Sequence, residues 1–266
     1  MSFNITVEGG KSVRLKTKGK YCDRDIVVSA TGDANLDSMI EGTITEIESN
    51  ALSVRRYACH SSPSLVKVNF PMATTIGEHA FYACYALESA SFAKSTGTGI
   101  RAFSECEALM NVSFPAATNV DTFSFTACAA LESIYFPEVL GIGASAFQAC
   151  ARLEVADFPK VNSISSTAFR VCALLKHLVL RHNGVVSLGN ANAFTNCYKM
   201  NGTIHSSYNP NGEQGYVYVP RDYLTQYPTA TNWSSLPLRY RALEDYTVDG
   251  TTIGALDIDK MNGTSG

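Results

Sequence analysis

The cysteines of this chain recur at a fixed interval. From Cys84 to Cys172 each cysteine follows the previous one by 22 residues, and Cys197 follows after 25. A disulfide framework or a metal site does not require so long and constant a step, whereas a structural repeat does. The spacing therefore predicts a chain built from repeated units of about 22 residues.

Each of these cysteines lies in the same short phrase, Ala-Phe-x-x-Cys-x-x-Leu. Ser124 replaces the alanine in one copy, Met200 replaces the leucine in the last, and an earlier copy has Cys59 in the Phe position and Ser62 in the Cys position. The copies run from about residue 49 to about residue 205. The side chains predicted to form the core are Phe81, Cys84, Leu87, Phe103, Cys106, Leu109, Phe125, Cys128, Leu131, Phe147, Cys150, Leu153, Phe169, Cys172 and Leu175.

The spacing within one unit predicts its local structure. Ala, Cys and Leu at i, i+4 and i+7 share one face of a short helix or helical turn. The segment that follows, as in residues 131–137, alternates apolar and polar residues like a short strand with one buried face. One unit cannot cover its own apolar stripe, so stacking predicts an α/β solenoid of about seven coils, with a parallel sheet on one side and short helical turns on the other.

Composition excludes several classes of protein. The 266 residues carry a net charge of −3, and 45% of them are hydrophobic. A near-neutral chain has no basic field to hold nucleic acid, and no apolar run is long enough to span a membrane. The first residues show no basic segment followed by an apolar stretch, so we expect no signal peptide.

The repeat resembles the BspA-type leucine-rich repeats, whose unit is similar to I-x-x-x-A-F-x-x-C-x-x-L-x-x-V-x-F-P. This resemblance implies a leucine-rich repeat solenoid that attaches to proteins, glycans or cell surfaces. Two copies depart from the pattern. In the third copy Ile100 stands two residues before the alanine instead of four, and the last copy has three additional residues. We expect both departures to bend or loosen the stack.

The flanks suggest further units. Residues 1–32 are predicted to form a small β-hairpin module, on the alternation within residues 10–28, and resemble modules of prophage-encoded and surface proteins of Gram-positive gut bacteria. A linker or N-terminal cap follows at 33–48, then the solenoid at 49–205, a C-terminal cap at 206–246, and a hairpin and tail at 247–266. The cap segment, from Tyr216 through Trp233, is similar to the one that closes many such arrays.

The reactive side chains give no catalytic pattern. We interpret the cysteine ladder as core packing rather than as disulfides or metal ligands, and the environment of Cys22 is open. Residues 141–146 match the dinucleotide pattern G-x-G-x-x-A, but they occupy a loop of the repeat, so the match is accidental. The histidines lack ligand spacing, and the pair Asp257 and Asp259 is a weak candidate for a cation. We predict no cofactor and no metal.

The outward face of the predicted sheet is the candidate binding surface, because solenoid sheets often present an extended one. The residues predicted to bind there are Lys67, Asn69, Asn111, Ser133, Tyr135, Asp157 and His177. The alternative is a merely solvated surface. The C-terminal aromatic residues are either a binding patch or the plug that closes the last coil.

These observations predict a non-enzymatic recognition or adhesion protein whose partner is a host-surface protein or glycan. It would be a component of a phage tail or baseplate, outside the cell, with the N-terminal module docked to phage structural proteins. The first alternative is an exported bacterial cell-surface adhesin whose signal lies outside this sequence. The second is a polysaccharide hydrolase, which needs paired carboxylates, of which the face offers only Asp157. Self-association through the open ends of the sheet is also possible.

Overall fold

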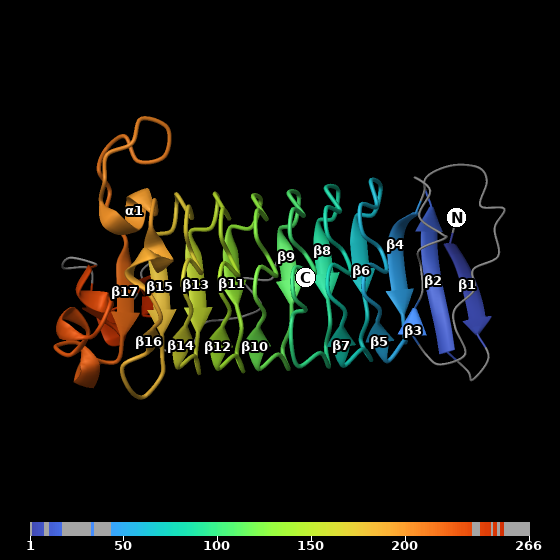
Figure 1. The fold of residues 1–266 in the computed structure, drawn as a ribbon, viewed down its shortest axis with the longest axis horizontal. Coiled ribbons are helices and arrows are strands. Elements are labelled where there is room, and N and C mark those ends of the chain that lie inside the picture. Colours follow the sequence, from blue (N-terminus) through green and yellow to red (C-terminus); the bar gives the residue numbers. More distant parts are fainter. Residues whose placement is uncertain are drawn as a thin grey trace.

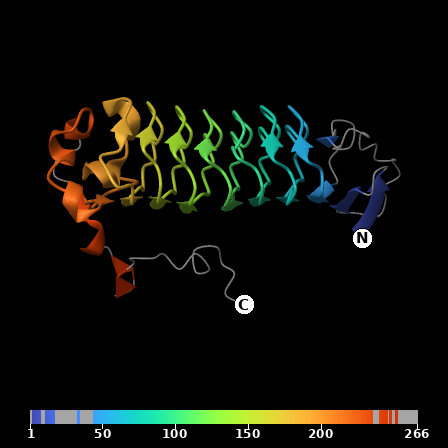
Figure 2. The same cartoon turned by 90° about the horizontal axis from the view of Figure 1, so that it is seen from below.

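The computed structural model is an elongated parallel β-solenoid, in which coils follow one another along the long axis (Figures 1 and 2). It describes residues 2–7, 11–17, 33–34, 44–235, 240–245, 247–248 and 251–252. The array has about nine turns of about 22 residues, two more than the repeat count predicts. The predicted solenoid class is confirmed. Cys22, Asp257 and Asp259 lie outside the described residues.

One long side of the solenoid is formed by the predicted strands. With one break along the array, each pairs in parallel with the equivalent strand of the next coil, as in Lys67 with Ser89 and Ser133 with Val155. These strands are β4 (Ile44–Ser49), β6 (Lys67–Asn69), β8 (Ser89–Ser91), β9 (Asn111–Ser113), β11 (Ser133–Tyr135), β13 (Val155–Phe158), β15 (His177–Leu180), β17 (Tyr216–Val219) and β18 (Tyr240–Ala242). They form two sheets, β4 to β9 and β11 to β18, which are end to end in Figure 1.

At the N-terminal end the sheet continues into a hairpin. Strands β1 (Ser2–Val7) and β2 (Lys11–Thr17) pair antiparallel, and β2 pairs antiparallel with β4. The module therefore adds strands to the first coil. Near the other terminus, β19 (Thr247–Val248) and β20 (Thr251–Thr252) also pair antiparallel.

A second β-side of the solenoid, made of one three-stranded and one four-stranded parallel sheet, was not predicted. Its strands have two residues each: β3 (Asp33–Ala34), β5 (Ser53–Val54), β7 (Thr75–Ile76), β10 (Asn119–Val120), β12 (Gly141–Ile142), β14 (Ser163–Ile164) and β16 (Ser187–Leu188). The apolar residue four positions before each alanine, such as Ile142 or Ile164, is its buried residue.

The predicted helices are instead pairs of tight turns. In each coil from residue 57 to residue 171, two residues four positions apart adopt the left-handed conformation, such as His79 and Ala83, and this conformation interrupts a helix. Between them Phe81 N–H donates to the carbonyl of Ala102 in the next coil at 2.8 Å. Backbone groups that would bond within a helix therefore bond between coils. The short helices described are η1 (Ala191–Phe194), α1 (Tyr198–Asn201), η2 (Arg221–Tyr223), η3 (Tyr227–Thr229), η4 (Trp233–Ser235) and η5 (Leu243–Asp245).

Phenylalanines form two parallel rows through the core. From Phe70 to Phe169 every eleventh residue is Phe, so each coil of 22 residues supplies one ring to each row. Within the first row, Phe125 stacks on Phe103 at 5.4 Å and on Phe147 at 5.5 Å, with interplanar angles of 8° and 3°. Rings of the second row meet the first at tilted or edge-on angles, as Phe114 does with Phe125. These are the offset and edge-to-face arrangements that aromatic rings favour.

The cysteine ladder is buried beside these rings, and its thiols are free. Each S–H donates to the carbonyl at the Phe position of the preceding coil, as Cys128 does to Phe103 at 3.1 Å and Cys150 to Phe125 at 3.2 Å. The thiol therefore fills space and adds a weak hydrogen bond between coils. At the end of the ladder, the side-chain amide of Asn201 donates to the Phe194 carbonyl at 3.2 Å.

The irregular third copy is held by substitute hydrogen bonds. Thr98 takes the position of the buried isoleucine and accepts a bond from Asp121 N–H at 2.9 Å, while Ile100 is exposed. The Asp121 carboxylate accepts from Gly99 N–H at 2.9 Å. Gly99 has a φ of +78°, which glycine adopts without strain. A shallow hollow of about 280 Å³ remains in this copy.

Aromatic side chains close the last coil. Trp233 and Tyr227 are fully buried, and Tyr240 packs against both. Trp233 Nε1–H donates to the Val186 carbonyl at 2.6 Å, and the Tyr227 hydroxyl accepts from Val186 N–H at 3.0 Å. Every polar atom in these contacts is thus satisfied while the rings cover the apolar end.

Candidate binding face

The candidate face is the outward surface of strands β4 to β18. Alternation along each strand turns one residue inward and its neighbours outward, as Ile134 lies in the core and Ser133 and Tyr135 face outward. Of the residues predicted to bind, Lys67 and Asn111 are exposed. The others that keep an accessible surface are partly buried: Asn69, Ser133, Tyr135 and His177.

The face changes in character along the solenoid. Strands β8 and β9 present only Ser89, Ser91, Asn111 and Ser113. Strands β11 to β18 present larger side chains, among them Tyr135, His177, Tyr216 and Arg241. We call this second part the aromatic end of the face, defined by Tyr135, Asp157, His177, Val179, Arg181, Tyr216, Tyr218 and Arg241.

The sequence pattern predicts that Asp157 is accessible on the face, but in the structure it is buried. Its side chain is 0% exposed, because Arg181 from the end of the next strand lies against it. Arg181 Nη2 is 2.9 Å from Asp157 Oδ2, and Nε is 3.3 Å from both carboxylate oxygens. Burial raises the pKa of Asp157, and the charge of Arg181 only partly offsets that effect. The ion pair therefore supports the surface from below, and the Asp157 carboxylate is not available to contact a partner.

Around this pair, aromatic rings and one arginine pack together. His177 and Tyr218 have ring centroids 5.6 Å apart, and Tyr218 packs on Val179 and Leu243. Arg241 lies over the Tyr216 ring at 4.5 Å, a distance that suits a cation–π contact. Burial lowers the pKa of His177, so the ring is neutral at pH 7. The outer surface therefore combines aromatic faces with one exposed positive charge.

Sequence reasoning left Tyr216 and Tyr218 as either a binding patch or part of the plug, and did not include them among the residues of the sheet face. The plug is formed by Tyr227, Trp233 and Tyr240, whereas Val217 and Val219 turn inward and the two tyrosines outward. The signal was present, because Tyr-Val-Tyr-Val-Pro repeats the alternation and the terminal proline of the earlier strands. Treated as one more coil, it extends the face by a strand.

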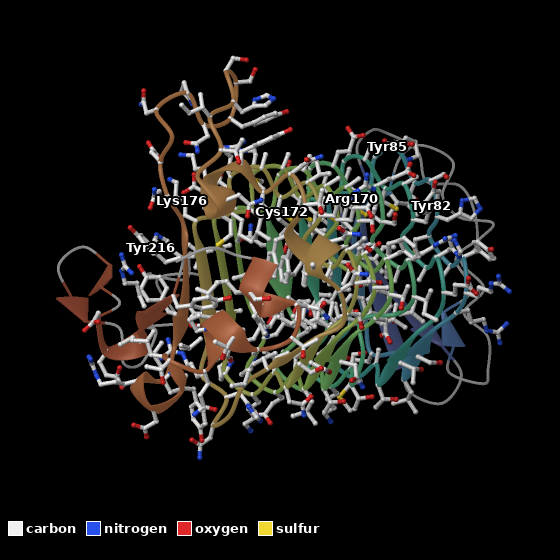
Figure 3. All side chains as sticks on the ribbon, turned by 60° about the vertical axis from the view of Figure 1, so that its left-hand side comes forward. Tyr82, Tyr85, Arg170, Cys172, Lys176 and Tyr216 are labelled. Atoms are coloured by element: carbon white, nitrogen blue, oxygen red, sulfur yellow. The ribbon has the colours of Figure 1, made fainter. Side chains whose placement is uncertain are left out.

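A smaller aromatic group lies on the turn side, away from Tyr216 (Figure 3). There the hydroxyls of Tyr82 and Tyr85 donate to the two oxygens of Glu105, at 2.7 and 3.4 Å. Tyr85 is 51% exposed. Tyr85 is therefore an accessible tyrosine that lies off the candidate face.

The described part of the chain has neither a cluster of metal-binding side chains nor a helix that could span a membrane. Within residues 44–235 and the shorter described segments, no three His, Cys, Asp or Glu side chains gather in a way that suits a metal ion. In the same ranges, no helix has both the length and the apolarity to cross a membrane.

Parallel coils of about 22 residues, with a Phe, Cys and Leu interior and one broad sheet face, define a leucine-rich repeat solenoid. The family model described as BspA type leucine rich repeat region matches residues 39–152 and 74–201, with six copies. Because these residues make up more than half of the chain, it belongs to the BspA-type leucine-rich repeat family, as the sequence resemblance predicts. No curated protein matches the sequence.

Several solved structures are similar to this chain. A leucine-rich cell surface protein from Faecalibacterium prausnitzii is 18% identical, covering 82% of this chain and 54% of its own, with a TM-score of 0.54. A leucine-rich repeat protein from Bacteroides ovatus is 20% identical, covering 55% and 42%, with a TM-score of 0.48. The leucine-rich repeat protein of T. pallidum is 22% identical, covering 61% and 85%, with a TM-score of 0.43. This chain spans about half the length of the first two.

Proposed function

We propose that the chain is a non-enzymatic recognition protein that binds a surface protein or glycan at the aromatic end of its sheet face. The membership of the BspA-type leucine-rich repeat family supports a protein-binding or adhesion role. One observation carries the position of the site. Tyrosine, histidine and arginine side chains gather on β11 to β18, while β8 and β9 present serine and asparagine.

A merely solvated face explains the small polar residues but not this gathering. Half-buried tyrosines next to arginine are the combination that supplies most of the binding energy at protein interfaces. Their rings are already fixed by neighbours: Arg241 covers Tyr216, and Tyr218 packs on His177. Fixed side chains lose little rotamer entropy on binding, so the face is prepared for a partner.

The structure argues against the hydrolase alternative, because Asp157, the carboxylate that it would need on the face, is buried. Asp157 is buried beneath Arg181, so its oxygens cannot approach a glycosidic bond. A glycosidase needs two accessible carboxyl groups on either side of that bond. The geometry therefore favours recognition over hydrolysis.

Among the two locations predicted, the cell surface has support. The solved structure from F. prausnitzii is described as a cell surface protein, and it shares this fold over most of the chain. Neither the structure nor its relatives offers an observation that favours a phage particle. We therefore propose adhesion at a bacterial cell surface, with a partner outside the cell.

The test is binding of the purified chain to printed arrays of folded extracellular protein domains and of glycans. Tyr216→Ala is expected to weaken binding to the retained probe at least tenfold, because it removes a partly exposed ring and its cation–π contact with Arg241. Tyr85→Ala removes a more exposed tyrosine on the turn side, so it is the control and should bind like the native chain. No retention on either array, or equal loss with both variants, overturns the proposal.

A further inference from the structure

The array is interrupted once by a long insertion. In the preceding coil the strand begins five residues after the cysteine, from Cys172 to His177, whereas the next strand begins 19 residues after its cysteine, from Cys197 to Tyr216. His177 and Tyr216 still pair in register, so the additional residues are not needed to continue the sheet. Insertions in repeat proteins that leave the array intact often lie at the binding face.

The insertion projects outward. Residues 202–215, which we call the projecting loop, follow α1 and rise beyond the stack of coils (Figure 1). The loop returns to the solenoid at Gly215, whose N–H donates to the Lys199 carbonyl at 2.8 Å, and enters β17 at Tyr216. It therefore stands directly beside the aromatic end of the face.

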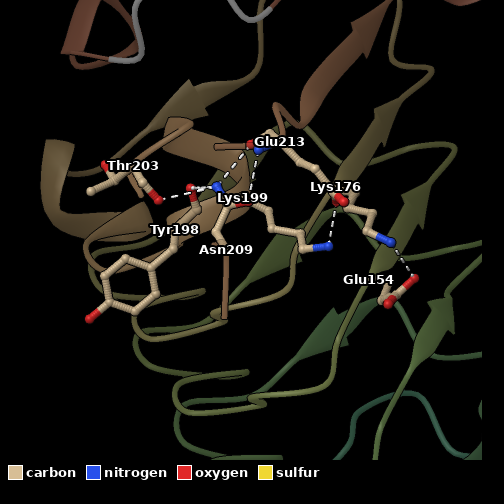
Figure 4. A network of polar contacts seen from close by, with 7 residues as sticks. All are labelled: Glu154, Lys176, Tyr198, Lys199, Thr203, Asn209 and Glu213. Carbon is tan, nitrogen blue, oxygen red and sulfur yellow. Dashed lines mark hydrogen bonds and ion pairs between the residues drawn. The ribbon is translucent and has the colours of Figure 1, made fainter. Parts of the chain in front are cut away.

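A single buried side chain holds the loop in shape. Asn209 is 0% exposed, and its Nδ2 lies within hydrogen-bond distance of the carbonyls of Tyr198, Thr203 and Glu213, at 3.2, 3.1 and 3.0 Å. Its Oδ1 accepts from Glu213 N–H at 2.8 Å (Figure 4). A side chain that ties three points of a loop together fixes its conformation before any partner arrives.

An ion pair attaches the loop to α1. Lys199 Nζ is 2.5 Å from Glu213 Oε2, and this contact lowers the pKa of Glu213. Glu213 is the only Asp, Glu, Lys or Arg in residues 202–215, so the tip is free of formal charge. Salt bridges to a charged partner are therefore not what the tip offers.

The tip displays apolar and aromatic surface instead. Ile204 is 73% exposed and Tyr208 is 40% exposed. The His205 ring packs against two tyrosines, 4.2 Å from Tyr198 and 5.0 Å from Tyr208, and these two rings are 5.9 Å apart. Burying the exposed apolar surface of Ile204 in a partner would remove it from water, which is favourable in free energy.

We propose that the projecting loop is a second recognition element, which inserts into an apolar cleft of a folded protein partner. The proposal rests on the proposed function and names its partner as a protein. Two observations favour a protein over a glycan or small molecule. The loop is convex, whereas sites for small ligands are concave. Eight of its 14 residues are Asn, Gly, Ser or Tyr, the residue types enriched in antibody loops, which bind proteins with fixed rings and adaptable polar groups.

The test uses the full chain on the array of folded extracellular domains. Ile204→Ser and Tyr208→Ser are expected to weaken binding to the retained domain at least tenfold, since each removes an anchor from the cleft. Met110→Ser, which alters an apolar side chain of 48% exposure elsewhere on the solenoid, should leave binding unchanged. The same domain printed after heat denaturation should not be retained, because its cleft is gone.

Asn209→Ala tests the fixed shape of the loop separately from its contacts. It leaves Ile204 and Tyr208 in place, so we expect a several-fold loss of affinity, while the thermal unfolding of the solenoid stays as in the native chain. Binding that survives both Ile204→Ser and Tyr208→Ser overturns the loop proposal. If Tyr216→Ala removes that binding, the proposed function stands without the loop. Retention on glycans alone overturns the loop proposal and leaves the sheet face as the site.

Discussion

Removing one ring from the middle of the first Phe row tests whether stacking between coils stabilises the array. Phe125→Ala deletes a fully buried ring, which costs about 3–5 kcal/mol in protein cores. For a chain of this size each kcal/mol lowers Tm by about 2–4 °C, so the expected shift is about 6–20 °C. This loss combines burial with stacking and does not separate them.

Phe125→Leu separates the two contributions, because it keeps most of the apolar volume. It removes two stacked contacts, to Phe103 and Phe147, and two angled contacts, to Phe114 and Phe136. At about 0.5–1.5 kcal/mol each, the two stacked contacts alone are worth about 1–3 kcal/mol. Phe194→Leu is the matched control at the end of the row. Phe194 stacks on Phe169 alone and meets Trp233 at a tilt of 35°, so its loss should be about half as large.

Urea unfolding with two probes measures these losses. Far-UV circular dichroism reports all coils, whereas fluorescence of the single tryptophan, Trp233, reports the C-terminal end. In a solenoid each coil contacts only its neighbours, so the central Phe125→Ala defect should separate the two transitions. Equal losses of less than about 0.5 kcal/mol for Phe125→Leu and Phe194→Leu would refute the stacking argument.

Three further predictions follow from the buried groups. Burial raises the pKa of Cys150 to about 12, so in a Cys22→Ser chain the native thiols should react with Ellman's reagent only on unfolding; fast reaction of several thiols contradicts the ladder. Burial lowers the pKa of His177 below its ordinary 6.5, so the folded state binds the proton less readily than the unfolded state and stability falls as pH drops through about 6.5; urea titrations should show a weaker pH dependence in His177→Gln than in the native chain, and an unchanged slope refutes this. Arg181→Met leaves Asp157 buried and unpaired, so it should cost about 3–5 kcal/mol by urea unfolding, while Asp157→Leu with Arg181→Met should recover most of the loss; no recovery refutes the role of burial.

The repeat period predicted the solenoid because it is a long-range signal, present in six copies. Local structure was harder to predict. The spacing of Ala, Cys and Leu suits a helix, but residues such as Thr167 and Val171 adopt the left-handed conformation that β-branched side chains disfavour. Hydrogen bonds between coils impose that conformation, and a single unit gives no sign of them. The two narrow sheets were missed because strands of two residues are too short to show alternation.

The candidate face shows the same limit. Alternation predicted which residues point outward, but whether an outward residue is accessible depends on its neighbours in other coils. Asp157 is covered by Arg181, which lies 24 residues later in the sequence, and the repeat pattern does not predict that contact. The projecting loop was visible only as missing regularity, and its shape depends on the hydrogen bonds of Asn209.

The strict register between coils has a consequence for how such a gene can change. Val155 meets His177 as Ser133 meets Val155, so each of these regular coils offers its successor the same backbone groups and the same ring to stack upon. Loss or duplication of a DNA segment that encodes one whole middle coil would join surfaces that already fit. Length can therefore vary in whole steps between related strains while both closing ends, and the loop near one of them, are kept.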